Sequence, residues 1–498
     1  MTAYAELEGR FKRILVLREA GGILQWDTAT MMPKGGAGVR SEQITALQLT
    51  GHELITDPRV PDLLGEADAA ASGLDAWQRA NLREMRRAWI HASALDGPLV
   101  EALTRARLAC EMTWREARPA SDFARVAPQF KALLARVREV ADAKAARLGC
   151  TPYEALLDEY EPGFRTARID ALFDELAGML PDILARVLAR QQAAPAPIAP
   201  TGPFPVPAQR ALCERLMRQL GFDFDSGRLD VSLHPFCGGV PEDVRITTRF
   251  DEADFARSIM GVLHETGHAL YEKGLPAAWR HQPVGEARGM ALHESQSLMV
   301  EMLACRGGAF MEFAAPLMRE AFGGSGPAWQ AANLHRLAIR VAPGFIRVDA
   351  DEVTYPAHVI LRYRLERDMI AGRIAVEDLP AAWNAGMQAL LGITPPDDAR
   401  GCLQDIHWYD GGWGYFPTYT LGALCAAQLF DTALRAVPDI PDAMRRGDFT
   451  PLLGWLRANV HGKGSLLMTE ELIREATGQP LGTAAFRTHI ERRYLDNE

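Results

Sequence analysis

Long stretches in which apolar residues recur every three or four positions constrain the fold of this chain most strongly. In residues 3–24, charged side chains fill the positions between the apolar ones. This spacing places the apolar side chains on one face of an α-helix. Four more stretches share it and are rich in strong helix formers: residues 75–95, 99–118, 123–149 and 168–194. The sequence therefore predicts a mostly α fold.

A proline-rich segment interrupts these helices. It holds six prolines between Pro195 and Pro207. Because proline fixes φ and lacks an N–H, we expect an extended, non-helical segment. The segment marks either a domain boundary or a surface crossing within one domain. The chain length does not decide between them, because 498 residues are enough for one large domain or several ordinary ones.

A small sheet is expected in the middle of the chain, after a helix at 208–222. Residues 228–236 and 243–250 alternate and are rich in β-branched side chains, so they are the strand candidates. Helical patterns resume afterwards and continue to the end. The next predicted helix contains residues 261–271, GVLHETGHALY, with Asp251 as its expected N-cap and Gly274 at its end.

Two histidines lie four positions apart in this helix. His264 and His268 would share one face, about 6 Å apart at Cβ, and can bind one tetrahedral zinc ion. Glu265 lies one step around the helix, where its carboxylate can take a proton from the attacking water and pass it to a leaving amine. Tyr271 and Gly274 occupy the Gly and His positions of the longer HExxHxxGxxH pattern, which excludes that class.

A glutamate from a following helix is the other common third ligand. Glu294 lies in an apolar helical stretch, where an acid must be paired or bound to a metal. Glu286, Glu301 and His293 are alternatives that the pattern leaves open.

Composition excludes several classes of protein. A net charge of −10 argues against a nucleic-acid binder, which would carry a basic face. Seven scattered cysteines form neither a disulfide framework nor a cysteine zinc site and fit a reducing, cytoplasmic setting. The N-terminus lacks the apolar core of a signal peptide, and no run of about 18 apolar residues predicts a membrane span.

Several short motifs occur together and in a fixed order. They are LQWDTATMMPKGG (24–36), HPF (234–236), DVRIT (243–247), HETGH (264–268), HESQ (293–296), IRVDAD (346–351) and GCLQDIHW (401–408). In this combination the chain resembles the carboxypeptidase Taq family of thermostable metallocarboxypeptidases over nearly its whole length.

The resemblance implies a large helical metallopeptidase fold with a deep groove and a small β-sheet beside the active site. It also implies a single domain over 1–498, with the proline-rich crossing at 195–207, and a homodimer. The implied activity is removal of residues from the free C-termini of peptides, with zinc as cofactor and cobalt able to substitute. By position, His264, His268 and Glu294 correspond to the zinc ligands, and Glu265 to the general base and acid.

A carboxypeptidase must also bind a free α-carboxylate, for which a guanidinium is well suited. The resemblance points to Arg347, which could instead form a salt bridge with Asp349 or Asp351. Arg245 on a predicted strand could lie beside the peptide backbone. An ion pair between Arg245 and Asp243 is the favoured interpretation.

The tetrahedral intermediate needs a hydrogen-bond donor besides the metal. The glycine-rich loop 411–422 offers Tyr415, which we favour, and Tyr419. His234 and His407 are further candidates, although a lone histidine is more often a packing residue.

Two other functions fit part of this pattern. A helical zinc endopeptidase or oligopeptidase would share HExxH and Glu294 but needs no group that binds a terminal carboxylate. A non-catalytic, zinc-containing peptide-binding protein belongs to another class. Glu265 argues against it, because a structural zinc site does not use a base.

Overall fold

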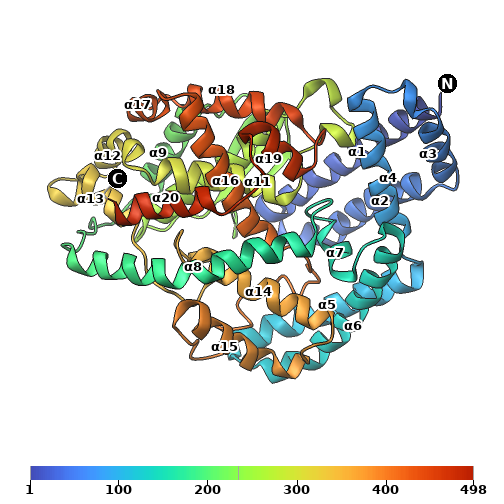
Figure 1. The fold of residues 1–498 in the computed structure, drawn as a ribbon, viewed down its shortest axis with the longest axis horizontal. Helices are drawn as coiled ribbons and strands as arrows, with labels where there is room; N and C mark the ends of the chain where they lie inside the picture. The colour runs from blue at the N-terminus through green and yellow to red at the C-terminus, as the bar shows by residue number, and fades with distance from the viewer. Residues whose placement is uncertain (1, 234, 497–498) are drawn as a thin grey trace.

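The computed structural model describes residues 2–233 and 235–496, and within them it confirms the mostly α prediction. Helices at the N-terminal end form a separate layer at one end of the molecule (Figure 1). They are α1 (Ala3–Thr30), α2 (Ala37–Thr56), α3 (Arg59–Ala69) and α4 (Ala76–Ser93). Their apolar side chains, among them Leu7, Phe11 and Leu63, form a core of their own.

The next helices enter a second, much larger core. They are α5 (Gly97–Ala120), α6 (Phe123–Leu148), α7 (Pro152–Leu157), α8 (Thr166–Ala193) and α9 (Val206–Gln219). Residues 195–205 contain neither helix nor strand, as the prolines predict. Side chains on both sides of this segment, such as Phe173 and Leu216, belong to the same large core.

Within the described residues the sheet has three strands, where the sequence predicts two. They are β1 (Gly227–Val231), β2 (Phe236–Val240) and β3 (Asp243–Thr248). Central β3 pairs in parallel with β1 and antiparallel with β2. The strand predicted at 228–236 ends at Val231, and β2 escapes prediction because glycines disfavour strands. Gly239 is required there, since a Cβ at its φ of +91° would lie 2.0 Å from the carbonyl oxygen of Asp243.

Helices dominate the C-terminal half. The bounds are α10 (Phe255–Lys273), α11 (Met290–Leu298), α12 (Gly308–Ala321), α13 (Ala331–Ala338), α14 (Tyr355–Ile370), α15 (Leu379–Leu391), α16 (Pro417–Ala436), α17 (Ile440–Arg445), α18 (Thr450–Asn459), α19 (Thr469–Thr477) and α20 (Ala484–Leu495). Helix α11 continues directly into a π-helix, Met299–Cys305. Helix α11 packs against both α10 and α16 near the centre of the molecule (Figure 1).

A groove of about 800 Å³ runs beside this centre. Its walls come from α1, from residues 237–240 of β2, and from the chain between the end of α10 and the start of α11. The small sheet therefore lies beside a deep groove, as expected.

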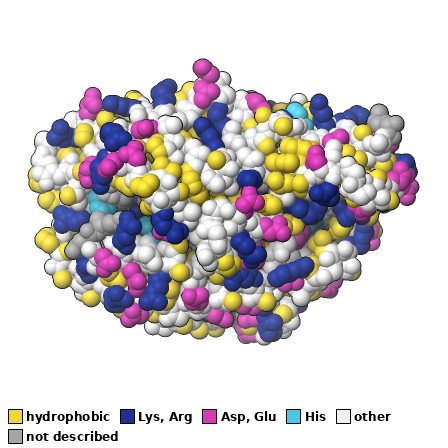
Figure 2. Space-filling view, turned by 45° about the horizontal axis from the view of Figure 1, so that its top comes forward, with side chains coloured by type: hydrophobic (Ala, Val, Ile, Leu, Met, Phe, Trp, Pro, Cys, Tyr) yellow, Lys and Arg dark blue, Asp and Glu magenta, His cyan; other side chains and the backbone are white. Residues whose placement is uncertain are grey.

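The outer surface carries charges of both signs. On the face shown in Figure 2, acidic and basic side chains are interspersed among apolar ones. Among the described residues, no helix combines the length and the apolar character that crossing a bilayer requires.

Candidate active site

Helix α10 carries the HETGH motif and begins three residues later than predicted. Its N-cap is Asp254, whose carboxylate accepts hydrogen bonds from the backbone N–H groups of Ala256 and Arg257. The predicted cap, Asp251, instead accepts from the N–H of Ala253 in the preceding turn. The helix ends at Lys273, as Gly274 predicts. Both acids suit a cap, and only the fold distinguishes them.

The three side chains proposed from the sequence as metal ligands come together. Nε2 of His264 lies 3.9 Å from Oε2 of Glu294, and Nε2 of His268 lies 3.6 Å from the same oxygen. One donor atom from each residue falls within 4.8 Å of the others. Two imidazole nitrogens and one carboxylate oxygen at this spacing fit a divalent ion that keeps a coordination position for water or substrate. The residues present could therefore hold a catalytic metal.

Glycines allow the ligand helices to approach so closely. A Cβ on Gly267, within HETGH, would lie 2.5 Å from the carbonyl oxygen of Gln296 and 2.6 Å from Cα of Ser297. A Cβ on Gly422 would lie 2.9 Å from Cβ of Glu294 on the other side of α11. Helix α11 is thus held between the backbones of α10 and α16, and this contact fixes the position of Glu294.

The histidines present Nε2 to the site because Nδ1 is engaged behind it. Nδ1 of His264 lies 3.0 Å from Oε2 of Glu301, and Nδ1 of His268 lies 3.1 Å from the carbonyl oxygen of His293. Both oxygens only accept, so an Nδ1 proton donated to them leaves Nε2 free for a metal. Nδ1 of His268 also lies 2.7 Å from Nδ1 of His293, which then accepts rather than donates. Two alternatives for the third ligand, Glu301 and His293, therefore lie behind the histidines. The other, Glu286, is ion-paired with α1.

Burial and nearby charge set the protonation of this site. Burial raises the pKa of Glu265 to about 7, with the charge of His264 opposing the rise and that of Glu294 adding to it. Burial and the positive charge of neighbouring histidines hold the pKa of His268 well below its usual value. Burial lowers the pKa of His264, but the carboxylates of Glu301, Glu294 and Glu265 outweigh it and raise this pKa to about 10. The carboxylates thus favour a positive charge at this place.

Arg347 lies in a second buried cluster. Its Nη2 is 2.9 Å from Oδ1 of Asp405, and its guanidinium lies 4.6 Å from the ring centre of Tyr419. Arg362 shares the same aspartate, with Nε 2.7 Å from Oδ2. One carboxylate therefore faces two guanidinium groups, which leaves an excess positive charge for an anionic ligand.

The salt bridges considered as the alternative role of Arg347, with Asp349 or Asp351, are not among the described contacts. Asp349 pairs with Arg257 of α10, and Asp351 accepts hydrogen bonds from backbone N–H groups at the start of α14. The actual partner, Asp405, belongs to the GCLQDIHW motif, 58 residues further along the chain. Sequence proximity suggested the wrong carboxylates, because folding brings these two motifs together.

The aromatic candidates cluster with Arg347. Nε2 of His407 lies 3.3 Å from the hydroxyl of Tyr419, whose ring centre is 5.1 Å from that of Tyr415. Burial, with the charge of Glu294, raises the pKa of both tyrosines, so their hydroxyls stay protonated and can donate. Tyr355 at the start of α14 joins this group, 6.1 Å from Tyr419 between ring centres. Tyr355 was not predicted as a site residue, because it lies outside every motif that carries the resemblance.

Of the two remaining candidates, Arg245 is described, and it lies in a separate ion pair. Arg245 pairs with Asp243, at 2.6 Å between Nη2 and Oδ2, and its guanidinium packs over the ring of Trp26 at 4.4 Å. This confirms the structural interpretation of Arg245. His234 lies outside the described residues.

Comparisons with known proteins agree with this architecture. A model of the carboxypeptidase Taq (M32) metallopeptidase family matches residues 6–494. Thermostable carboxypeptidase 1 of Thermus thermophilus is 38% identical over 502 residues, which cover 99% of this chain and 98% of the relative. Among solved structures, metallocarboxypeptidase 1 of Trypanosoma cruzi has a TM-score of 0.97 and 44% identity, with 99% of each chain covered. The M32 carboxypeptidase of Deinococcus radiodurans R1 has a TM-score of 0.92 and 34% identity, with 99% of each chain covered.

A helical fold with an HExxH helix beside a groove defines this chain as a metallopeptidase. The family match and the relatives extend over nearly its whole length. The chain belongs to the carboxypeptidase Taq (M32) metallopeptidase family and is a metallocarboxypeptidase. The resemblance inferred from the motifs is therefore confirmed.

Proposed function

We propose that this metallocarboxypeptidase removes single residues from the free C-termini of peptides, with His264, His268 and Glu294 as metal ligands. The observation that carries the proposal is the grouping of their three donor atoms within 4.8 Å of one another. The groove of about 800 Å³ supports it, because His293, which contacts His268, lies in its wall and so links the groove to the site.

A divalent ion bound there supplies Lewis acidity, which polarises the scissile carbonyl and lowers the pKa of water. Glu265 takes the proton of the attacking water and delivers it to the departing amine, a role that suits a carboxyl with a pKa of about 7. Arg347 binds the terminal carboxylate of the peptide. Tyr415, or its neighbour Tyr419, donates a hydrogen bond to the developing oxyanion, with His407 beside them.

The finer assignments belong to the same proposal. We assign zinc as the ion, since two imidazoles and a carboxylate form a zinc-type donor set, with cobalt(II) able to replace it. We propose a single domain over the whole chain, supported by the large core shared across the proline-rich segment. Assembly as a homodimer rests on the family resemblance. A cytoplasmic location is supported by seven unpaired cysteines.

The deciding experiment is mass spectrometry of one peptide with a free C-terminus and the same peptide as a C-terminal amide. The zinc-loaded protein should produce a ladder of single-residue losses from the free peptide only, and a chelator should abolish it. Internal cleavage of both peptides would identify an endopeptidase. Absence of cleavage with any divalent metal would favour a non-catalytic peptide-binding protein.

Replacement of Arg347 with Met is expected to raise KM for a free-ended peptide by about 10- to 100-fold. The loss of a charge-assisted hydrogen bond of roughly 1.5–3 kcal/mol accounts for this size. Asp405 keeps its pairing with Arg362, so the fold should survive. Steady-state kinetics and thermal unfolding are measured together. An unchanged KM in a folded variant would remove Arg347 from substrate binding.

A further inference from the structure

The π-helix after α11 carries a residue that contacts the metal site. Glu301 is 8% exposed, and its carboxylate joins Nδ1 of His264, at 3.0 Å, to Nη2 of Arg306, at 2.6 Å. A π-helix is rare and often occurs at a functional site. The position of the π-helix determines the position of the Glu301 carboxylate, and this carboxylate orients the ring of His264.

The end of this π-helix is held by an arginine from the last helix of the chain. Arg493 of α20 donates from Nη1 to the carbonyl oxygen of Met302, at 2.5 Å, and from Nη2 to that of Leu303, at 2.7 Å. These carbonyls lie in the last turn, where they lack helical partners. The guanidinium is also 3.0 Å from Oε2 of Glu352, and both side chains are buried. A buried guanidinium with three acceptors has a fixed geometry.

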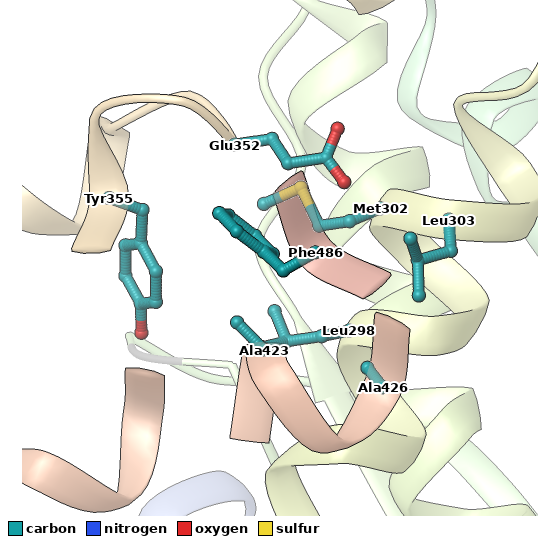
Figure 3. A pocket seen from close by; sticks show the side chains of 8 residues that line it. All are labelled: Leu298, Met302, Leu303, Glu352, Tyr355, Ala423, Ala426 and Phe486. Atoms are coloured by element: carbon teal, nitrogen blue, oxygen red, sulfur yellow. The ribbon is translucent and has the colours of Figure 1, made fainter. Parts of the chain in front are cut away.

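Apolar packing does not fill this junction. Figure 3 shows Met302 beside Phe486 of α20, with Leu303 further to the right and Tyr355 on the opposite side. These residues and Glu352 line a cavity of about 20 Å³. The lining of the cavity is almost wholly apolar. The contacts of Arg493 with the carbonyls of Met302 and Leu303 therefore supply polar links between the end of the π-helix and α20 beside this small void.

We propose that Arg493 is a positioning residue for the metal site, acting through the π-helix and Glu301 on His264. The inference rests on the proposed function, because it takes His264 as a metal ligand. The path has three steps. The guanidinium of Arg493 binds the carbonyl oxygen of Leu303, the backbone of the π-helix connects Leu303 to Glu301, and the carboxylate of Glu301 contacts the imidazole of His264. Loss of a partner that orients a metal ligand typically weakens metal binding by about 10- to 100-fold.

The test compares the zinc dissociation constants of the wild type, Arg493→Met, Arg493→Lys, Glu301→Gln and the double variant Arg493→Met/Glu301→Gln. Arg493→Met should bind zinc about 10- to 100-fold more weakly and alter the visible spectrum of the cobalt(II) form. Arg493→Lys should show a smaller change in the same direction, because an ammonium group cannot reach all three acceptors in the fixed geometry of a guanidinium. The double variant should bind zinc as tightly as whichever single variant binds it less tightly, because both substitutions interrupt the same path.

Arg487→Met is the matched control. Arg487 lies on the same helix, is 57% exposed and pairs only with Glu491 among the described contacts. It should keep wild-type zinc affinity and the wild-type cobalt spectrum. Thermal unfolding of each variant separates a general loss of stability from a local change at the metal. If Arg493→Met fails to fold, Arg493→Lys decides the question.

His264→Ala separates this inference from the proposed function. His264→Ala should lose zinc. If it does, and Arg493→Met keeps the wild-type zinc affinity and cobalt spectrum, only the role of Arg493 is overturned, and the metal site stands. Where Arg493→Met does not fold, the same result in Arg493→Lys has this meaning. Strictly additive losses in the double variant would also overturn the role of Arg493. Zinc bound by His264→Ala as tightly as by the wild type would refute the metal site itself.

Discussion

Replacement of Glu265 with Gln is expected to abolish turnover while zinc stays bound. The carboxamide keeps the shape of the side chain but cannot accept a proton from water. Loss of a general base typically lowers kcat by about 10²- to 10⁴-fold. The ligand atoms belong to His264, His268 and Glu294, so zinc stoichiometry should equal that of the wild type. Stopped-time peptide assays and metal analysis of the same preparation provide the measurement.

Glu366→Gln is the matched control for this result. Glu366 is fully buried, and burial raises its pKa to about 8. Its oxygens accept from the N–H of Gly414, at 2.7 Å, and the hydroxyl of Tyr153, at 2.9 Å. A carboxamide keeps the first contact with its oxygen and replaces the second by donating from its NH2 to the tyrosine oxygen. Near-wild-type kcat is expected for it. Near-full activity in Glu265→Gln would show that another group moves the proton.

Replacement of Gly267 with Ala is expected to disrupt the metal site through the backbone. The added Cβ would meet the backbone of Gln296 and Ser297 at 2.5–2.6 Å, so α10 and α11 must separate. Overpacking of this kind costs about 1–3 kcal/mol or more. Because Glu294 moves with α11 while His264 and His268 stay on α10, zinc affinity should fall together with the melting temperature. Calorimetry and zinc titration measure the two effects.

Gly261→Ala tests the same change on the same helix. No heavy atom lies within 4 Å of a Cβ at Gly261. Alanine in a helix is favoured over glycine by about 0.5–1 kcal/mol, so this variant should be as stable as the wild type or more so, with unchanged zinc affinity. Equal behaviour of Gly261→Ala and Gly267→Ala would mean that close contact between α10 and α11 does not position Glu294.

Local patterns predicted the parts of this molecule that local forces determine. The apolar spacing located α1, α4, α5, α6 and α8, and the prolines located the crossing before α9. The motif HETGH on a helix predicted the pair His264 and His268, because i and i+4 share a helical face. The grouping of Glu294 with them was anticipated from the apolar character of its helix and from the family resemblance.

Features that depend on the tertiary fold could not be predicted in this way. Strand β2 contains two glycines and exists because β3 pairs with it. Asp405 lies 58 positions after Arg347 in the sequence, and only the folded chain brings the two together. The contact between Glu301 and His264 depends on a π-helix, and no hydrophobic period distinguishes its sequence from that of an α-helix.

The separate core of the N-terminal helices has a consequence for how such an enzyme can diversify. Helix α1 contributes one wall of the groove, and its Tyr4, Leu7 and Phe11 belong to the N-terminal core, while α10, α11 and α16 belong to the other core. Trp26, near the end of α1, packs instead against Arg245 of β3. Substitutions in α1 can therefore remodel the surface that a peptide meets without straining the helices that carry the ligands. The opposite wall, which includes Glu272 of α10 and His293 of α11, has less freedom to change, because the same helices carry the metal ligands.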